Sequence, residues 1–140
     1  MSKRQKQSIC HCINLRRAAA AVTDYYDRKL QPLGLTINQY SLLINVKRLQ
    51  PVSVSLLASQ VGLDRTTLAR SLKPLFDGGL MVDTAQAKQR NRQLQLTEHG
   101  SNTLKAALPL WEKAQSDIEL TLGQSNLKKM NYLLFKLESL

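Results

Sequence analysis

The sequence predicts a mainly α-helical chain with one small β-hairpin. Apolar residues recur at helical spacing along most of its length, and glycines and prolines separate the helical segments. Between Val82 and Leu96 the pattern instead alternates, as in a hairpin with a long polar tip. Residues 53–100 read in order as a short helix, a tight turn, a second helix and two strands joined by a basic loop. That order is a helix-turn-helix followed by a β-wing.

Two helices are predicted before the helix-turn-helix, each with a clear boundary. The first covers residues 9–31 and ends at the Pro32–Gly34 segment. The second follows a capping box, in which Thr36 and Gln39 satisfy first-turn amides reciprocally, and it stops before Pro51. The apolar stripe of the first helix is broken and consists of Ile9, Ile13, Val22 and Tyr26.

The first helix of the motif is predicted between Ser53 and Gly62. The serine can cap first-turn amide groups, and the glycine can adopt the positive φ of a helix stop. The residues expected to point inward are Leu56, Leu57 and Val61.

The second helix is predicted to begin at Asp64, because a carboxylate at this position accepts hydrogen bonds from first-turn N–H groups. Pro74 removes one backbone hydrogen bond and is expected to bend the last turn, before a turn at Asp77–Gly79. The expected core face consists of Leu68, Leu72, Leu75 and Phe76. The side chains left for solvent or a ligand are Arg65, Thr66, Thr67, Arg70, Ser71 and Lys73.

The wing is predicted as a strand over Leu80–Asp83, a long polar loop and a strand over Arg92–Leu96. Lys88 and Arg90 lie in the loop, and Arg92 lies beside it. A basic helix face next to a basic loop is suited to lie on a DNA duplex.

Two more helices are predicted after Thr97, which caps the first of them. Gly123 stops that helix and Ser125 begins the last one. The apolar stripes of these two helices are Leu104, Leu108, Trp111, Ile118 and Leu122, and then Leu127, Met130, Leu134 and Leu137. Together with the first helix, they carry more apolar surface than a small winged core can cover. We therefore expect a two-fold homodimer.

The length of 140 residues predicts a single unit. Within it, residues 36–98 are expected to bind DNA, and residues 9–33 and 99–140 are expected to form the dimer. The net charge of +10 implies an acidic partner, either nucleic acid or an anionic membrane surface. No apolar run approaches the roughly 18 residues that cross a bilayer, and no signal peptide is recognisable. We expect no membrane association and a cytoplasmic protein.

The chain resembles the MarR family of bacterial winged helix-turn-helix regulators. Five short segments occur in the family's order and at its distances: Gly34–Leu43, Leu57–Ala58, Leu63–Arg70, Gly79–Val82 and Leu94–Gly100. The resemblance implies a triangular homodimer whose terminal helices interlock and whose two winged lobes grip neighbouring major grooves. It also implies a repressor that leaves its DNA when a small aromatic or phenolic effector binds, or when a cysteine is oxidised.

One position departs from the family pattern. The family's wing usually carries Asp-x-Arg, in which the acid pairs with the arginine and stiffens the hairpin. Here Lys88 stands in the place of the acid and only Arg90 matches. A wing that is less rigid and more basic is expected to bind phosphate well and to discriminate sequence less.

The residues expected to contact a pseudo-palindromic operator lie on both helices of the motif and on the wing. Arginine suits guanine in the major groove, and basic wing residues suit a narrow minor groove. The alternatives are an ordinary solvated helix face and a solubilising loop. The predicted contact residues are Ser53, Arg65, Thr66, Thr67, Arg70, Ser71, Lys73, Lys88, Arg90 and Arg92.

Cys10 and Cys12 are the only cysteines, and their C-x-C spacing is too close for an easy disulfide on a helix. Two cysteines also do not make a structural zinc site, which needs four ligands. They either sense oxidant, with the thiolate favoured by nearby Arg16 and Arg17 and by a helix N-terminus, or bind a metal between subunits with help from His11. The alternative is that they pack as small apolar residues in the dimer. Peroxide-sensing family members resemble the chain in having a reactive cysteine here, with tyrosine hydroxyls close by. The candidates for such tyrosines are Tyr25, Tyr26 and Tyr40.

The sequence contains no recognisable catalytic constellation, so we expect no enzyme, no cofactor and no resident metal. Three alternatives remain open at this point. They are a sequence-tolerant architectural DNA-binding protein, a C-x-C redox protein and a winged protein-interaction module. Binding that barely changes with sequence would indicate the first, and absence of DNA affinity at moderate salt would indicate the last.

Overall fold

The structure is a computed structural model that describes residues 6–85 and 92–140. Its elements are α1 (His11–Leu30), the 3-10 helix η1 (Gln31–Leu33), α2 (Ile37–Leu49), α3 (Val54–Val61), α4 (Arg65–Asp77), β1 (Met81–Asp83), β2 (Leu94–Leu96), α5 (Glu98–Leu122) and α6 (Gln124–Glu138). The predicted fold class, mainly α with one antiparallel hairpin, is confirmed.

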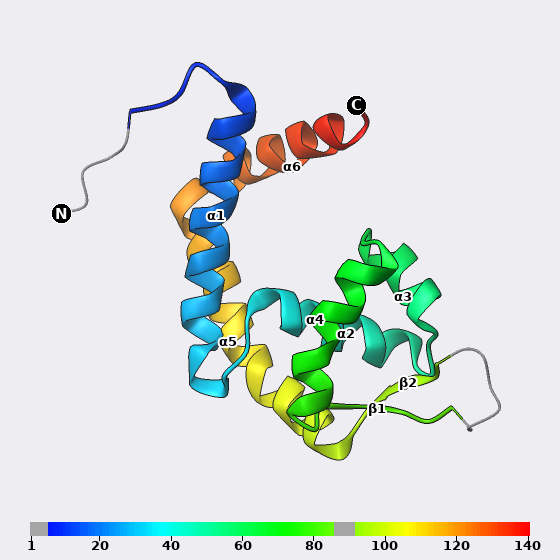
Figure 1. Ribbon diagram of the computed structural model, residues 1–140. Helices are drawn as coiled ribbons and strands as arrows, with labels where there is room; N and C mark the ends of the chain where they lie inside the picture. Colours follow the sequence, from blue (N-terminus) through cyan, green and yellow to red (C-terminus); the bar gives the residue numbers. More distant parts are fainter. Residues whose placement is uncertain (1–5, 86–91) are drawn as a thin grey trace.

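The molecule has two parts (Figure 1). The winged lobe consists of α2, α3, α4, the hairpin and the first turns of α5. The stalk consists of α1 packed along α5, with α6 branching from its remote end. The hairpin pairs Met81 with Leu96 and Asp83 with Leu94. On its other edge β2 forms a bridge through Leu94 to Val52, so the strand is held from both sides.

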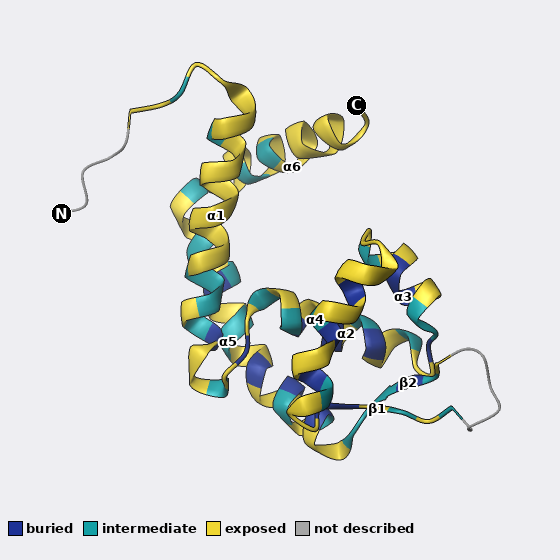
Figure 2. Cartoon of the chain, in the orientation of Figure 1, coloured by how far each residue is buried: buried dark blue, intermediate teal, exposed yellow. Residues whose placement is uncertain are grey.

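The core lies in the winged lobe. Its fully buried members include Leu43, Leu57, Leu68, Leu72, Leu75 and Leu94. Figure 2 shows these buried positions where the helices of the lobe converge, whereas α6 and the first half of α1 are exposed. Trp111 packs against the core and stacks on Tyr40, with ring centroids 6.0 Å apart. The same core also includes Leu30 at the end of α1 and Ala107 of α5, so it joins the winged lobe to the stalk.

The predicted caps form through local hydrogen bonds. Thr36 and Gln39 make the reciprocal capping box at the start of α2. The hydroxyls of Ser53 and Thr97 accept hydrogen bonds from first-turn amides of α3 and α5, at 3.1 and 2.9 Å. These bonds satisfy N–H groups that have no partner inside the helix, and they fix where each helix begins.

Three details differ from the sequence-based expectation. Leu56 is 47% exposed and Ala58 is buried in its place. Neighbouring residues on a helix point 100° apart, so the narrow buried face of short α3 takes Leu57 and Ala58 and leaves Leu56 outside. Phe76 is half-buried rather than fully in the core. The last helix begins at Gln124 and not at Ser125, with Gly123 as its cap.

Helix α4 continues through Pro74 and ends at Asp77. The proline withdraws one backbone donor from the carbonyl of Arg70. Both residues are exposed, so water can reach this part of the helix. The helix therefore continues past the proline for three more residues.

Gly100 fixes the junction between α5 and the winged lobe. A Cβ atom built at this position would lie 2.0 Å from the carbonyl oxygen of Leu80 and 2.9 Å from its carbonyl carbon. Thr97 ties the same junction, because its N–H donates to Leu80 and its hydroxyl donates to the carbonyl of Gly79. Only a glycine lets the helix approach this backbone so closely.

We expect Gly100→Ala to lower the free energy of unfolding by about 1–3 kcal/mol, because the added methyl group forces backbone to shift. Urea unfolding followed by circular dichroism measures this loss. Ser101→Ala, one residue further along α5, is the control and should unfold close to wild type. Equal midpoints for Gly100→Ala and wild type would show that the junction is loose.

Polar contacts join the two helices of the stalk. The Tyr25 hydroxyl donates to Asp117, and the Tyr26 hydroxyl donates to Gln115. Lys113 lies 2.7 Å from Asp117 and, with the tyrosine, lowers the pKa of this carboxyl. The hydrogen bond to Asp117 in turn raises the pKa of Tyr25. Gln115, which interrupts the apolar stripe of α5, thus has a partner on α1.

Candidate nucleic-acid interface

The exposed face of α4 is opposite its buried face. Leu68, Leu72 and Leu75 point into the core, whereas Thr66, Arg70 and Lys73 lie on the opposite side of the helix and are exposed. Two of these three exposed side chains are basic. This face is the part of the helix-turn-helix that a flat or grooved partner can reach.

Asp64 is the N-cap of α4, and its side chain is hydrogen-bonded to Thr67. Its carboxylate accepts hydrogen bonds from the N–H and the hydroxyl of Thr67, both at 2.8 Å. The N–H bond is the main cause of a lowered pKa for Asp64. Ser71 is half-buried and donates its hydroxyl to the carbonyl of Thr67 at 3.1 Å. Thr67 and Ser71 line a pocket together with residues of α2, and their hydroxyls are engaged inside the protein.

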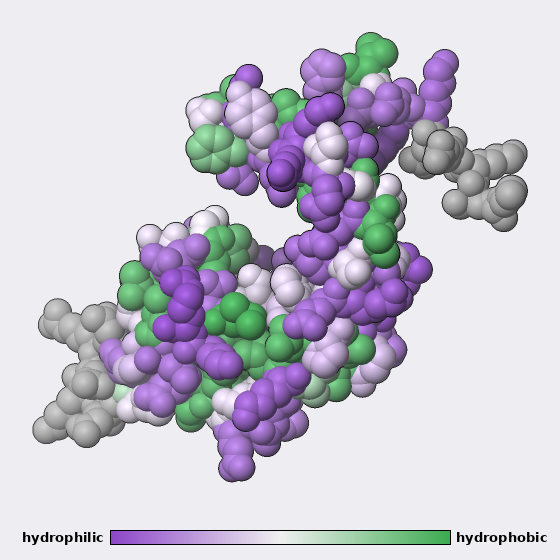
Figure 3. All heavy atoms as spheres, turned by 180° about the vertical axis from the view of Figure 1, so that it is seen from behind, coloured by the Kyte–Doolittle hydropathy of each residue, from purple (hydrophilic) through white to green (hydrophobic). Residues whose placement is uncertain are grey.

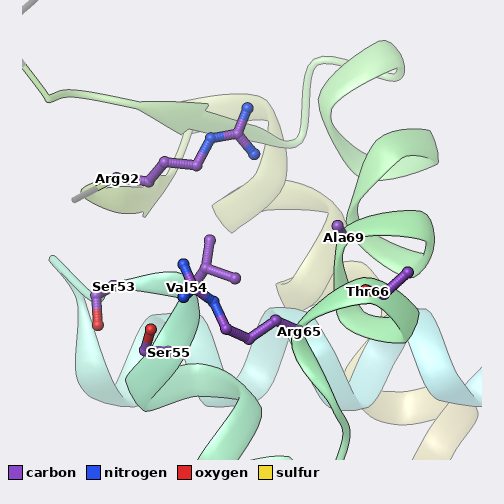
Figure 4. Close-up of a pocket in the computed structure, with 7 residues that line it drawn as sticks. All are labelled: Ser53, Val54, Ser55, Arg65, Thr66, Ala69 and Arg92. Atoms are coloured by element: carbon purple, nitrogen blue, oxygen red, sulfur yellow. The ribbon is translucent and has the colours of Figure 1, made fainter. Parts of the chain in front are cut away.

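A cleft of about 360 Å³ separates α4 from the wing (Figure 4). Arg65 borders it on the α4 side and Arg92 on the wing side, and Ser53 lies at the start of α3, below Arg92 in the view. The residues that line it are Ser53, Val54, Ser55, Arg65, Thr66, Ala69 and Arg92. The structure thus brings together predicted residues from three separate segments around one basic opening.

Arg92 is held by two neighbours. Its Nε lies 3.4 Å from Oδ2 of Asp83, and its guanidinium lies over the Phe76 ring, 5.3 Å from the centroid. Burial opposes the charged form of Asp83, but hydrogen bonds from Gln93 and Ala85 and the charge of Arg92 lower its pKa. Sequence reasoning missed Asp83. The sequence does offer a signal for this pair, because an acid ends one predicted strand and an arginine begins the next.

Two further predicted contact residues, Lys73 and Ser53, already have partners within the chain. Lys73 pairs with Asp77 at 2.7 Å, and both side chains are largely exposed. Ser53 uses its hydroxyl oxygen as the cap of α3. Lys88 and Arg90 lie outside the described residues, so the departure from Asp-x-Arg is a statement about sequence alone.

Cys10 and Cys12 are exposed free thiols at the start of α1. Cys10 precedes the helix and makes no side-chain capping bond. Residues 6–85 and 92–140 contain no group of three potential metal-ligating side chains. The candidate tyrosines do not approach these thiols within one chain. Tyr25 follows Cys12 by 13 residues of continuous helix, about 20 Å, and Tyr40 is buried in the lobe.

These elements define a winged helix-turn-helix protein. No family model matches the chain. Solved structures do. The transcriptional regulator MosR of M. tuberculosis in complex with DNA is 33% identical, with a TM-score of 0.78 over 93% of this chain and 96% of that one. A MarR-family regulator from Rhodococcus sp. RHA1 is 23% identical, with a TM-score of 0.74 over 92% and 94% of the two chains.

The transcriptional repressor CouR bound to p-coumaroyl-CoA is 24% identical, with a TM-score of 0.83 over 92% of this chain and 91% of that one. The likeness to MosR extends over nearly the full length of both chains. The chain belongs to the MarR family of transcriptional regulators. Among the helices of the described residues, none is both long and apolar enough to cross a membrane.

Proposed function

We propose that the protein is a non-enzymatic, homodimeric transcriptional repressor that binds a pseudo-palindromic DNA operator. The observation that carries the proposal is the basic opening between α4 and the wing, bordered by Arg65 and Arg92. Next to it, the exposed face of α4 carries Arg70 and Lys73. MosR, which is 33% identical, was solved in complex with DNA, and this supports the same partner here.

In this proposal, α4 enters the major groove, where Arg70 and Thr66 reach base edges. Arg65 and Arg92 lie toward the sugar–phosphate backbone on either side of the cleft. Thr67 and Ser71 support the helix rather than reading bases, because their hydroxyls already have partners in the protein. Lys73 must leave Asp77 in order to reach phosphate, and the exposure of this pair makes that exchange inexpensive.

A second copy of the chain is the proposed partner of the stalk. No residue of α6 is buried within a single chain, although the helix carries Leu133, Phe135 and Leu137 at 43–70% exposure. A mostly apolar groove of about 530 Å³ lies between α1 and α6. Figure 3 shows apolar surface on this part of the molecule among hydrophilic side chains. In this proposal residues 9–33 and 99–140 form the dimer, apart from the first turns of α5, which pack in the winged lobe, and residues 36–98 form the DNA-reading unit.

Selection from a library of randomised duplexes tests the proposed function. The full-length protein is incubated with the library at moderate salt, and the recovered DNA is sequenced. We expect a two-fold related motif with half-sites about one helical turn apart. The affinity for that selected duplex should exceed the affinity for random duplexes by about a thousandfold or more. Equal affinity for both would indicate a sequence-tolerant DNA-coating protein, and no binding would indicate a protein-interaction module.

Release from DNA is proposed to follow effector binding or thiol modification. CouR was solved both with p-coumaroyl-CoA and with a DNA duplex, and this supports control by a small aromatic or phenolic effector. Cys10 and Cys12 support the thiol route, because both are exposed at the start of a stalk helix. A change there acts on the proposed dimer and not on the DNA-reading lobe.

If the thiol route operates, hydrogen peroxide should weaken DNA binding by the wild-type protein. Peroxide oxidises a thiolate first to a sulfenic acid, which adds a polar group to the stalk. The Cys10→Ser, Cys12→Ser double variant should keep its affinity. Fluorescence anisotropy on the selected duplex, with and without peroxide, compares the two. Full affinity of both proteins in peroxide would leave effector binding as the route of release.

A further inference from the structure

The carboxylate of Asp83 bonds to both sides of the base of the wing. Asp83 is the last residue of β1, and its Oδ1 accepts hydrogen bonds from the N–H groups of Ala85 and Gln93, each at 2.9 Å. Its Oδ2 faces Nε of Arg92. The last backbone pair of the hairpin joins Asp83 to Leu94. The side chain of Asp83 therefore bonds to backbone that follows β1 and backbone that precedes β2, at the loop end of the paired strands.

The contacts continue from the wing to α4. Arg92 lies over the ring of Phe76, and Phe76 packs against the core from the last turns of α4. The same arginine borders the cleft opposite Arg65 (Figure 4). A continuous set of contacts thus runs from Asp83 through Arg92 to the helix whose exposed face carries Arg70.

The remainder of the wing base is fixed independently of this set. Val52 and Leu94 exchange two backbone hydrogen bonds at 3.1 and 2.8 Å. Thr84 donates its N–H to the carbonyl of Gln93 at 2.8 Å. The strands therefore stay paired whatever Arg92 does. Within this frame, Asp83 determines where the Arg92 side chain points, since it supplies the only acid in the described residues that pairs with this arginine.

We propose that Asp83 is a positioning residue for DNA binding, which holds Arg92 against Phe76 and so sets the basic wall of the cleft relative to α4. The inference rests on the proposed DNA-binding function. Asp83 is half-buried, and a negative charge is repelled by phosphate. Its contribution therefore passes through Arg92 and does not come from contact with DNA.

Asp83→Asn separates this role from simple electrostatics, because the two explanations predict opposite changes in DNA affinity. The amide keeps an acceptor oxygen for Gln93 and Ala85 but loses the charge that pairs with Arg92. Removing an acid raises the net charge by one, so electrostatics alone would strengthen DNA binding. A positioning role predicts the opposite, an affinity for the selected duplex about fivefold weaker, near the low end for a contact residue.

Asp24→Asn is the matched control. It removes the same charge from an exposed i,i+4 pair with Arg28 on α1, outside the winged lobe. This variant should bind the selected duplex as tightly as wild type or slightly more tightly. Thermal unfolding of every variant is measured beside its DNA affinity.

A double-mutant cycle with Arg92→Gln completes the test. If Asp83 acts through Arg92, Asp83→Asn should cost less than twofold once Arg92 is replaced. A general loss of stability would instead weaken DNA binding by the same factor with and without Arg92. The cycle therefore distinguishes the two explanations even if Asp83→Asn lowers the melting temperature. Unchanged or tighter binding by Asp83→Asn alone, or full additivity, would overturn the inference. Failure of wild type to prefer the selected duplex would count against the proposed function instead.

Discussion

Arg70→Ala should weaken binding to the selected duplex by about 1–3 kcal/mol and should blunt the preference for that duplex over random DNA. The residue lies in the middle of the exposed face of α4, opposite the buried Leu68 and Leu72. If its guanidinium reads a base, the loss falls mainly on the specific complex and much less on the non-specific one. Anisotropy titrations against both duplexes give the two affinities and their ratio.

Arg28→Ala is the charge-matched control for this experiment. Arg28 is an exposed arginine on α1 whose partner is Asp24, so its removal changes the net charge by the same amount. It should lower both affinities slightly and leave their ratio unchanged. If Arg70→Ala gives the same small and equal losses, the exposed face of α4 is not the reading surface.

Leu134→Glu should convert the dimer into monomers or unfold it. The α6 stripe begins with Leu127 and Met130, which are half-buried within the chain, and continues through Leu134, which is 40% exposed. The stripe therefore extends past the surface that a single chain covers. A carboxylate buried there in the dimer costs several kcal/mol unless it is paired. Sedimentation velocity at micromolar concentration measures the species present.

Lys128→Glu tests whether any acid on α6 has the same effect. Lys128 is exposed and lies on a different side of the helix from the stripe. This variant should remain dimeric. A wild-type protein that sediments as a stable monomer would contradict the dimer directly, and monomeric Lys128→Glu would show that charge and not the apolar stripe decides assembly.

The features that the sequence predicted well are those determined by neighbours along the chain. Thr36, Ser53, Asp64 and Thr97 each cap a helix by bonding to an amide three residues ahead, so residue type and spacing suffice. The exposed basic face of α4 follows similarly from helical periodicity.

The features that were missed depend on packing between distant segments. Tyr25 and Asp117 are 92 residues apart in the chain, and nothing in their local surroundings indicates their hydrogen bond. The Asp83–Arg92 pair spans the wing loop and required the strand register. The choice of Ala58 over Leu56 for burial depends on how α3 is rotated against the rest of the lobe, which propensity does not determine.

Helix α5 connects the winged lobe to the stalk. It runs through 25 residues, and at 1.5 Å per residue its length is about 37 Å. One end is locked to Leu80 by Gly100, and the other lies against α1. For a rigid rod of that length, a tilt of about 5° at the stalk displaces the lobe by about 3 Å. In a dimer the two α5 helices double this displacement, to about a sixth of the roughly 34 Å between successive major grooves. A rotation of a few degrees at the subunit contact thus moves the two α4 helices out of register with successive major grooves of the DNA.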